Sequence, residues 1–540
     1  MIARRAFLGG TAALAAASAA RFVFAQAGRS HLGAPAGEAA AIEREAAAFA
    51  NPLRLPGASG LYGVMKASDF REVHVIRTEI ELLPGKRTPY LAYVAESGGK
   101  RFLNPALVGH RGKEMRVRMV NQLKEPTIIH WHGLSTDAKN DGNGLVVAEP
   151  GQAFEYAFKL QDRASMYFYH PHPHGYIPGQ VYHGLAGLLF VEDEEEEALR
   201  RALDLALGET EIPLVLQDRN FDAQGRLQYK LTSEEMFQGF LGERLLANLT
   251  EKPFIPAARR IYRWRILNGS NARTYQLAFL QGGRKLGCYL AGTDGGLLAA
   301  PLRVSQAFIS PGQRLDILLD LREAKEGPVT LGTLSFDPMH AEGVGGHSMA
   351  GMDHKMVAST EMDRMAMEGE PRALLRIDVK PAAYARKIPA ALSKLPAAKV
   401  PHDAPRRIKL AQDGKGKWTI NGQVYDAKTN AFIVQRGAAE IWLIENDSAS
   451  MPHPMHIHGF QFRVLERRGS PAQVRALAGD HGLLPQDRGV MDTIHVWPGE
   501  SVRIALDFSQ SYAGDQDYVF HCHNLEHAEL GMMIRYRVQA

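Results

Sequence analysis

Pairs of histidines separated by one residue occur at five places in this chain of 540 residues, which has 21 His, 18 Met and only 2 Cys. On a β-strand, residues i and i+2 project from the same face, so each pair can direct two imidazoles toward one point. Neutral imidazole binds copper and zinc well. Pairs from two parts of the chain could therefore enclose a cluster of metal ions. The pairs are His130/His132, His170/His172, His172/His174, His456/His458 and His521/His523.

The last pair indicates which metal is bound. Cys522 lies between His521 and His523, so on an extended strand its thiolate points away from both imidazoles, and one strand serves two metal sites. Two imidazoles, one thiolate and a weak axial thioether form a blue-copper site for one-electron transfer; zinc does not explain the methionine. A cysteine nucleophile is the alternative, but it needs neither the flanking histidines nor a downstream methionine. The remaining candidates on the thiolate side are His453, His527 and Met532.

Taken together, the motifs resemble the four copper-binding segments of the three-domain multicopper oxidases, in the same order and at similar separations. Two further stretches, 263–279 and 491–508, are similar to the second and third cupredoxin domains of that family. The four motifs are HWHG at 130–133, HPHPHG at 170–175, HPMHIHG at 453–459 and HCHNLEHAELGM at 521–532.

The resemblance implies four copper ions and assigns their ligands. The type 1 copper would be held by His453, Cys522, His527 and Met532. The type 2 copper would be held by His130 and His456, and the type 3 pair by His132, His170, His172, His458, His521 and His523. His174 is left without a ligand role and is expected to lie behind the ligands or at an entrance.

Family resemblance also implies the reaction. Single electrons enter at the type 1 copper, pass along Cys522 to His521 and His523, and reduce dioxygen to two waters at the three-copper cluster. Asp141 matches the family's acidic residue near the type 2 copper and is the first candidate proton relay; a turn role in DGNG is the alternative. Many relatives have Glu after the last type 1 histidine, where this chain has Ala528, so either Glu529 replaces it or protons take another route.

The segment 339–367 is the best indication of the substrate. It holds seven methionines and three histidines among Gly, Ser and Asp, and it is too polar to be a core stripe. Soft thioethers suit cuprous ion, and a similar segment lies near the type 1 site of bacterial copper-efflux oxidases. A loop that only covers the type 1 site is the alternative. The candidate ligands of a substrate copper are Met349, Met352, Met356, Met362 and Asp426.

The main hypothesis is therefore an exported oxidase that couples oxidation of cuprous ion to reduction of dioxygen, in copper tolerance. A laccase-like oxidase of phenols or aromatic amines is a close alternative. A copper-binding scaffold without turnover is a third, since some exported relatives have lost their ligands and serve cell division; here all the ligand types are present. A copper nitrite reductase is disfavoured, because its type 1 cysteine lacks histidines on both sides. A monomer is expected.

The elements that must position these residues are short strands. From about residue 70, apolar and polar residues alternate in runs separated by Gly, Pro, Asn and Asp, which predicts an all-β protein of Greek-key sandwich or barrel domains. The family resemblance implies that these are three cupredoxin-like domains in tandem. The predicted domains are 51–193, 194–370 and 371–540. An acidic helix at 192–207 is expected to link two domains, with the charges at 193–197 facing solvent.

The composition and the first 27 residues indicate where in the cell the protein is expected. A net charge of +4 leaves no footprint for nucleic acid, and outside the leader no run approaches the roughly 20 apolar residues of a membrane span. Residues 1–27 resemble a twin-arginine export signal: Arg4 and Arg5 precede an Ala-rich run that ends in Ala25-Gln26-Ala27. An ordinary secretory signal is the alternative. The mature protein is expected in the periplasm or otherwise exported.

Overall fold

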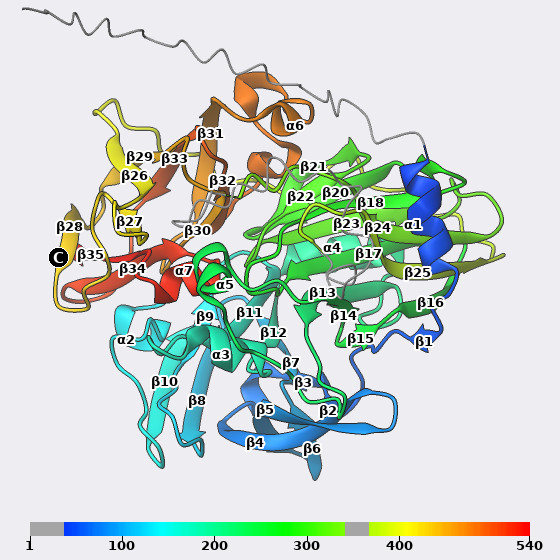
Figure 1. The fold of residues 1–540 in the computed structure, drawn as a ribbon, viewed down its shortest axis with the longest axis horizontal. Helices are drawn as coiled ribbons and strands as arrows, with labels where there is room; N and C mark the ends of the chain where they lie inside the picture. Colours follow the sequence, from blue (N-terminus) through cyan, green and yellow to red (C-terminus); the bar gives the residue numbers. More distant parts are fainter. Residues whose placement is uncertain (1–36, 341–366) are drawn as a thin grey trace, which may run out of the picture.

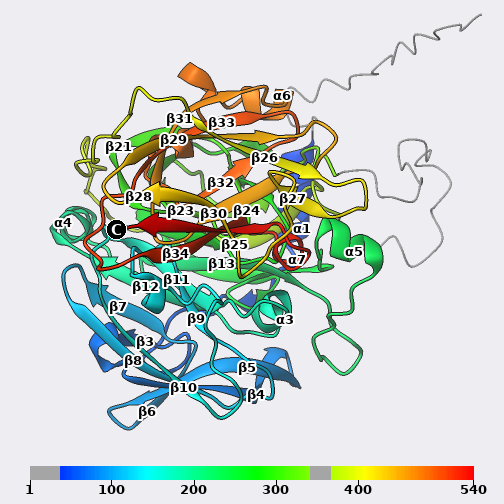
Figure 2. The same ribbon diagram turned by 90° about the vertical axis from the view of Figure 1, so that its left-hand side faces the viewer.

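The computed structural model describes residues 37–340 and 367–540, which form six β-sheets paired into three sandwiches (Figures 1 and 2). Each sandwich has its own buried cluster of apolar side chains drawn from both of its sheets. The prediction of an all-β protein is confirmed.

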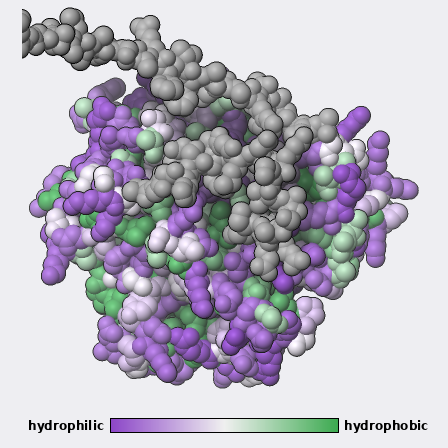
Figure 3. Space-filling model, in the orientation of Figure 1, coloured by the Kyte–Doolittle hydropathy of each residue, from purple (hydrophilic) through white to green (hydrophobic). Residues whose placement is uncertain are grey.

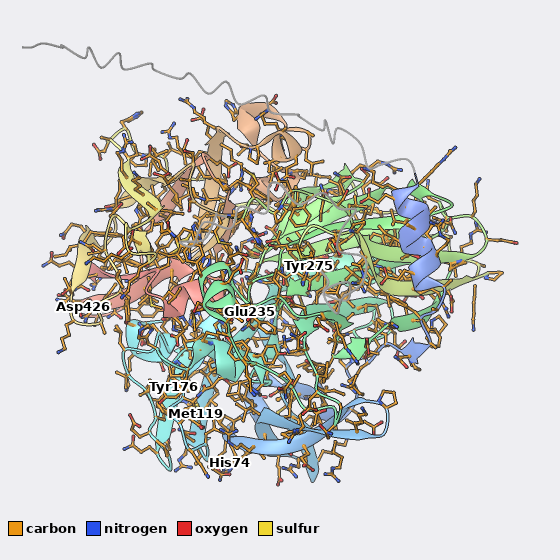
Figure 4. All side chains as sticks on the ribbon, viewed as in Figure 1. His74, Met119, Tyr176, Glu235, Tyr275 and Asp426 are labelled. Carbon is orange, nitrogen blue, oxygen red and sulfur yellow. The ribbon has the colours of Figure 1, made fainter. Side chains whose placement is uncertain are left out.

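The first sandwich joins a sheet of order β10-β8-β4-β5-β6-β2 to one of order β3-β7-β12-β11-β9. Strand β8 illustrates why these sequences form strands: Met115, Val117 and Met119 are buried, while Arg116 and Arg118 face outward (Met119 is labelled in Figure 4). The strands are β2 (Gly60–Leu61), β3 (Val64–Lys66), β4 (Glu72–Leu83), β5 (Lys86–Ser97), β6 (Lys100–Leu103), β7 (Ala106–His110), β8 (Glu114–Asn121), β9 (Ile129–His132), β10 (Ala153–Lys159), β11 (Ser165–Pro171) and β12 (Gly187–Glu192), and the helices are α2 (Ala138–Asp141) and α3 (Ile177–Tyr182).

The middle sandwich includes segments from outside its predicted range. Helix α1 (Glu38–Ala46) packs on its outer sheet, and β1 (Asn51–Pro52) pairs with β16. Strand β25, which begins after residue 370, pairs with β24 and β16 in that sheet. The strands are β13 (Glu211–Arg219), β14 (Arg244–Ala247), β15 (Thr250–Glu251), β16 (Pro253–Ala258), β17 (Ile261–Asn268), β18 (Tyr275–Gln281), β19 (Arg284–Lys285), β20 (Cys288–Thr293), β21 (Gly296–Val304), β22 (Ala307–Ile309), β23 (Arg314–Asp320), β24 (Pro328–Thr333) and β25 (Arg372–Lys380).

The acidic linker forms helix α4 (Glu194–Leu203), but its charges do not all face solvent. Asp193 caps the helix by accepting from the backbone N–H of Glu196 at 3.0 Å. The Glu196 carboxylate is fully buried and pairs with the guanidinium groups of Arg263 and Arg265 on β17. The solvated-face prediction is therefore wrong for Glu196, because the helix packs against a strand that presents arginines to it.

The third sandwich joins sheets of order β27-β26-β29-β33-β31 and β28-β35-β34-β30-β32. Its last helix, α7, follows β34 and lies beside α5 (Ser233–Gln238), which reaches over from the middle part of the chain (Figure 1). The elements are β26 (Arg406–Gln412), β27 (Trp418–Ile420), β28 (Asn430–Gln435), β29 (Ala439–Asn446), β30 (His453–Ile457), β31 (Phe462–Arg468), α6 (Ala472–Arg475), β32 (Thr493–Val496), β33 (Ser501–Asp507), β34 (Gln516–Cys522), α7 (Leu525–Glu529) and β35 (Met533–Gln539).

The outer surface is mainly hydrophilic on the face shown in Figure 3, with only scattered hydrophobic residues. Within 37–340 and 367–540, no helix is long and apolar enough to cross a membrane. The predicted export signal at 1–27 lies outside the described residues.

Candidate metal centre

Two antiparallel strand pairs carry the histidine motifs and meet where the first and third sandwiches touch. In the first sandwich His170 on β11 lies opposite His130 on β9, and in the third His521 on β34 lies opposite His456 on β30. His521 on β34 and His172, which follows β11, bring their Nε2 atoms within 3.2 Å of each other. Eight buried imidazoles from the two pairs fall into three groups whose ligand atoms lie within 4.8 Å of one another. The groups are, first, His130/His132/His456, second, His172/His458/His521 and, third, His132/His170/His523.

In the first group, backbone carbonyls fix the tautomers. His130 donates from Nδ1 to the Asp141 carbonyl at 2.8 Å, and His456 donates from Nδ1 to the Asp492 carbonyl at 2.9 Å. Both Nε2 atoms therefore carry a lone pair in the neutral ring, and they face each other at 3.4 Å. Two facing lone pairs repel each other, whereas a cation between them would be attracted to both.

The second group converges in the same way. His458 donates from Nδ1 to the Asp141 carboxylate at 2.8 Å, and His521 donates from Nδ1 to the Cys522 carbonyl at 2.9 Å. The Nε2 atom of His521 lies 3.0 Å from that of His458 and 3.2 Å from that of His172. These lone pairs form a ready-made ligand set for one metal ion.

The third group contains buried nitrogens that lack partners among the described residues. His132 is held by Asp492, whose carboxylate lies 3.1 Å from Nε2, which leaves Nδ1 without a partner. His170 donates from Nδ1 to the Pro171 carbonyl at 3.1 Å, which leaves Nε2 free, and neither ring nitrogen of His523 is bonded. Unpaired buried polar atoms are costly, and a bound metal would satisfy all three rings.

Burial keeps these imidazoles neutral. It lowers the pKa of His170 to about 3 and that of His521 to about 4, and it holds the pKa of the other six rings well below 6.5. A neutral ring has the free lone pair that metal binding requires. The donor set therefore fits copper.

A separate site lies on the other face of β34. The Cys522 sulfur is 3.7 Å from His453 Nδ1 and 3.6 Å from His527 Nδ1, and the two nitrogens are 3.2 Å apart. Met532 is buried in the same apolar cluster as Cys522, and its backbone carbonyl accepts from the Cys522 N–H at 3.0 Å. Burial raises the pKa of the Cys522 thiol, so a cation is needed to hold the thiolate.

Two aromatic residues cover this site. Trp418 lies with its ring centroid 4.9 Å from that of His453 and 5.0 Å from that of His527, and Phe237 of α5 stacks on Trp418 at 4.7 Å. His527 donates from Nε2 to the Phe237 carbonyl at 3.0 Å. Neither residue was predicted from the sequence, because neither is near the metal-binding motifs in the chain.

Models of multicopper oxidase domains match residues 94–196 and 399–540. The crystal structure of the McoA multicopper oxidase of Aquifex aeolicus is similar along 91% of this chain and 99% of its own, with 35% identity and a TM-score of 0.79.

The chain belongs to the multicopper oxidase family.

Other relatives of this multicopper oxidase differ in their described roles. The multicopper oxidase mco of Staphylococcus haemolyticus is 29% identical over 440 residues, which are 81% of this chain and 82% of that protein. A Campylobacter jejuni multicopper oxidase described as a metallo-oxidase is 26% identical, covers 91% of this chain and 100% of its own, and has a TM-score of 0.68. A Bacillus subtilis laccase and cell division proteins named FtsP are also similar. The resemblance to the family and to its cupredoxin-like three-domain fold is thus confirmed.

Asp141 lies at the cluster of this multicopper oxidase rather than in an exposed turn. Its side chain is fully buried and binds His458, and its carbonyl binds His130. Burial raises the pKa of the Asp141 carboxyl well above its usual value. The residue can therefore orient two imidazoles and hold a proton beside them.

A second buried carboxylate, Asp492, was not predicted. It contacts His132 and forms two hydrogen bonds with the Arg314 guanidinium, at 2.8 and 2.6 Å. Arg314 belongs to the middle sandwich, which thereby contributes to the cluster although it carries no ligand motif. The only sequence signal was the position of Asp492 within the 491–508 stretch.

Glu529 does not replace the missing glutamate within the cluster. Its carboxylate accepts from the Gly175 N–H at 2.8 Å and lies 3.1 Å from His174 Nδ1, at a groove on the surface. Ala528 is fully buried in an apolar cluster that includes Ile177. His174, with 43% of its side chain exposed, lies at the surface beside Glu529.

The predicted substrate-copper residues are not assembled in the described part of the chain. Asp426 lies in an exposed turn at the outer edge of the third sandwich (Figure 4), where its carboxylate accepts from the Lys428 N–H and the Thr429 hydroxyl. Each of its two oxygens thus accepts one local hydrogen bond. The other candidates, Met349, Met352, Met356 and Met362, lie outside the described residues.

Proposed function

We propose that this chain is an exported multicopper oxidase that takes single electrons from cuprous ions and uses them to reduce dioxygen to water. The observation that carries the proposal is the arrangement on β34: the Cys522 thiol faces two imidazoles on one side, while His521 and His523 join six other imidazoles on the opposite side.

The residues fit four copper ions. A type 1 copper would be held by His453, Cys522 and His527, with Met532 as axial ligand, and a type 2 copper by His130 and His456. The type 3 pair would be held by His132, His170 and His523, and by His172, His458 and His521. When bound, copper supplies one-electron transfer at the first site and four-electron reduction of dioxygen at the others.

The protein's own groups connect and orient the two sites. Cys522 is covalently continuous with His521 and His523, and its carbonyl accepts from His521 Nδ1, so the two sites are joined by the shortest possible stretch of chain. The carbonyls and carboxylates behind the imidazoles fix the ring orientations before any metal binds. Asp141, buried with a raised pKa, is the proposed source of protons at the cluster.

Two observations favour a metal ion over a phenol as the reductant. Trp418 and Phe237 cover the type 1 residues, and the adjoining cavity, lined by the neighbouring Pro454 and Asn524, has a volume of only about 10 Å³, too small for an aromatic ring. The methionine-rich segment begins and ends beside this cavity, whose wall includes Pro338 and Glu368. The laccase-like alternative instead requires a phenol to reach His527. The proposal includes a role in copper tolerance and action as a monomer.

Oxygen uptake tests the proposal. Copper-loaded protein should consume one dioxygen for every four cuprous ions added, and should oxidise a bulky phenol at least about tenfold more slowly by kcat/KM. A preference for the phenol would support the laccase-like alternative.

A scaffold role is the other alternative, because FtsP relatives are cell division proteins. Within the described residues, every proposed copper ligand is present and oriented, which favours turnover. A protein that bound copper but consumed no oxygen with either reductant would instead support the scaffold.

A further inference from the structure

A small cavity adjoins the Cys522 site. Its wall contains a thioether, from Met451, and an imidazole, from His495, neither of which is a ligand of the four proposed copper ions. The volume is about 10 Å³, which is near the space that one water molecule or one small ion occupies. His495, Met451, Glu368, Trp497 and Asn524 are among the lining residues.

His495 is the unusual member. The residue is only 6% exposed, yet neither of its ring nitrogens has a hydrogen-bond partner among the described residues. Burial, together with the nearby Arg467 guanidinium, lowers the pKa of His495 to about 3, so the ring is neutral. A buried imidazole with both nitrogens unpaired is costly unless something occupies the cavity.

The other two groups are held in place from behind. Met451 is 4% exposed, and its carbonyl accepts from the Asn446 side chain at 2.8 Å, which fixes the backbone just before His453. The Glu368 carboxylate accepts from the Thr274 N–H at 2.5 Å and lies 2.5 Å from His340 Nε2. A thioether, an imidazole and a carboxylate thus line one ion-sized space.

The cavity is in contact with the proposed type 1 site. His495 on β32 lies directly opposite Pro454 on β30, next to His453. Asn524, another wall residue, has its amide nitrogen 3.1 Å from Nε2 of His527. An ion in the cavity would therefore be separated from the His453 and His527 ligands by only a single layer of groups.

We propose that this cavity binds the cuprous substrate, with His495 and Met451 as ligands and Glu368 supplying negative charge. The inference rests on the proposed function and adds the identity of the substrate site. Imidazole and thioether are the soft ligands that favour cuprous ion. On transfer of one electron toward the His527 edge, the bound cuprous ion becomes cupric, which thioether holds less well, so the product leaves. Four such ions and four protons balance the reduction of one dioxygen to two waters.

Silver(I), a redox-inert analogue of cuprous ion, provides the binding test. Copper-loaded full-length protein is titrated with silver(I) without oxygen, for the parent and for Met451→Leu and His495→Gln. The Met451→Leu change conserves volume and should fold even if His495→Gln does not. Met115→Leu, in the core of the first sandwich, and His402→Gln, at an exposed position, are the matched controls. The methionine-rich segment contributes equally to every protein, so the difference in stoichiometry isolates the cavity.

Each variant should bind one silver ion fewer than the parent, and its KM for cuprous ion should rise at least about tenfold relative to its KM for a phenol. Unchanged silver stoichiometry, or equal changes in both KM values, would overturn the proposed site while leaving cuprous oxidation by the parent intact. Parent protein that binds the extra silver ion through His495 but oxidises no cuprous ion would instead refute the proposed function, and with it the substrate role of the cavity.

Discussion

The two faces of strand β34 differ sharply in what surrounds them. On the face of His521 and His523, six of the eight imidazoles bond from their outer nitrogens to carbonyls or to Asp141 and Asp492. On the opposite face, the Cys522 sulfur lies in an apolar cluster that includes Trp418 and Met532, although the outer nitrogens of His453 and His527 also bond to polar groups.

This difference separates two kinds of chemistry. Polar groups behind the imidazoles fix their orientation and bring carboxyl groups to the place where protons are consumed. Apolar groups around the sulfur exclude water, which favours transfer of electrons without protons. One strand keeps the two environments apart while it joins them covalently, and each of the following predictions tests one of the two faces or their connection.

Replacing Cys522, which joins the two faces of β34, should have the largest effect on activity. In Cys522→Ser the hydroxyl cannot replace the thiolate, so we expect loss of the intense blue absorption band and of measurable oxygen consumption. Cys288→Ser, in the middle sandwich, is the matched control and should keep both. A blue, active Cys522→Ser protein would show that electrons enter by another route.

Acid should weaken the histidine face when copper is absent. The folded-state pKa values of His170 and His521 are lowered to about 3 and 4, below the usual 6.5 of an unfolded chain. Below about pH 6.5 the unfolded chain therefore binds protons that the folded one cannot, and each ring lowers the free energy of unfolding by up to about 1.4 kcal/mol per pH unit.

Urea unfolding at pH 7 and pH 5 measures this effect. Copper-free protein should be less stable at pH 5 than at pH 7, and copper-loaded protein should lose at least as much stability, because in both forms only the unfolded, copper-free chain binds protons at these rings. A copper-free protein whose stability is unchanged between pH 7 and pH 5 would contradict the inference that the folded imidazoles are held neutral by burial.

Changing the carboxylate behind the cluster should have a smaller effect. Asp492→Asn removes the charge that faces both His132 and Arg314, so copper affinity or turnover should fall about 10- to 100-fold. Asp316→Asn breaks another buried pair, with Arg263, and should reduce stability without this loss of copper. Copper content and oxygen uptake distinguish the two outcomes.

The smallest effect is expected on the cysteine face. Trp418→Phe removes the hydrogen bond from the indole N–H to the Phe237 carbonyl and should cost about 1 kcal/mol of stability. It should also change KM for cuprous ion, because Phe237 and α5 cover the site. Trp442→Phe likewise loses one indole hydrogen bond, to Glu440, and should leave KM unchanged.

The sequence predicted the parts of the site that are local in the chain. Pairs such as His521/His523 were found because a strand alternates its side chains, and the alternation of Met115, Val117 and Met119 predicted the sandwich for the same reason. Partners contributed by distant segments could not be found in this way. Arg314 and Phe237 reach the metal sites only through packing between sandwiches, and His495 does so through the pairing of β32 with β30.

The errors have the same origin. The acidic residues around Glu196 in the sequence predict a charge that faces solvent. Its burial becomes favourable only because Arg263 and Arg265 on β17 pair with it. No element was predicted for the residues just after 37, yet helix α1 packs there on the middle sandwich. Its Glu45 carboxylate binds Arg372, the first residue of β25. Asp426 lies in an exposed turn that hydrogen-bonds its carboxylate, and its role at a substrate copper stays a prediction.

The most direct test of the central claim is the copper content of purified protein, measured together with its absorption spectrum. We expect four copper ions per chain and an intense blue band. One of the four ions should produce the band, and the other three should not contribute to it. Fewer than four copper ions, or a colourless protein with full copper content, would contradict the proposal that β34 serves a blue-copper site and a three-copper cluster on its two faces.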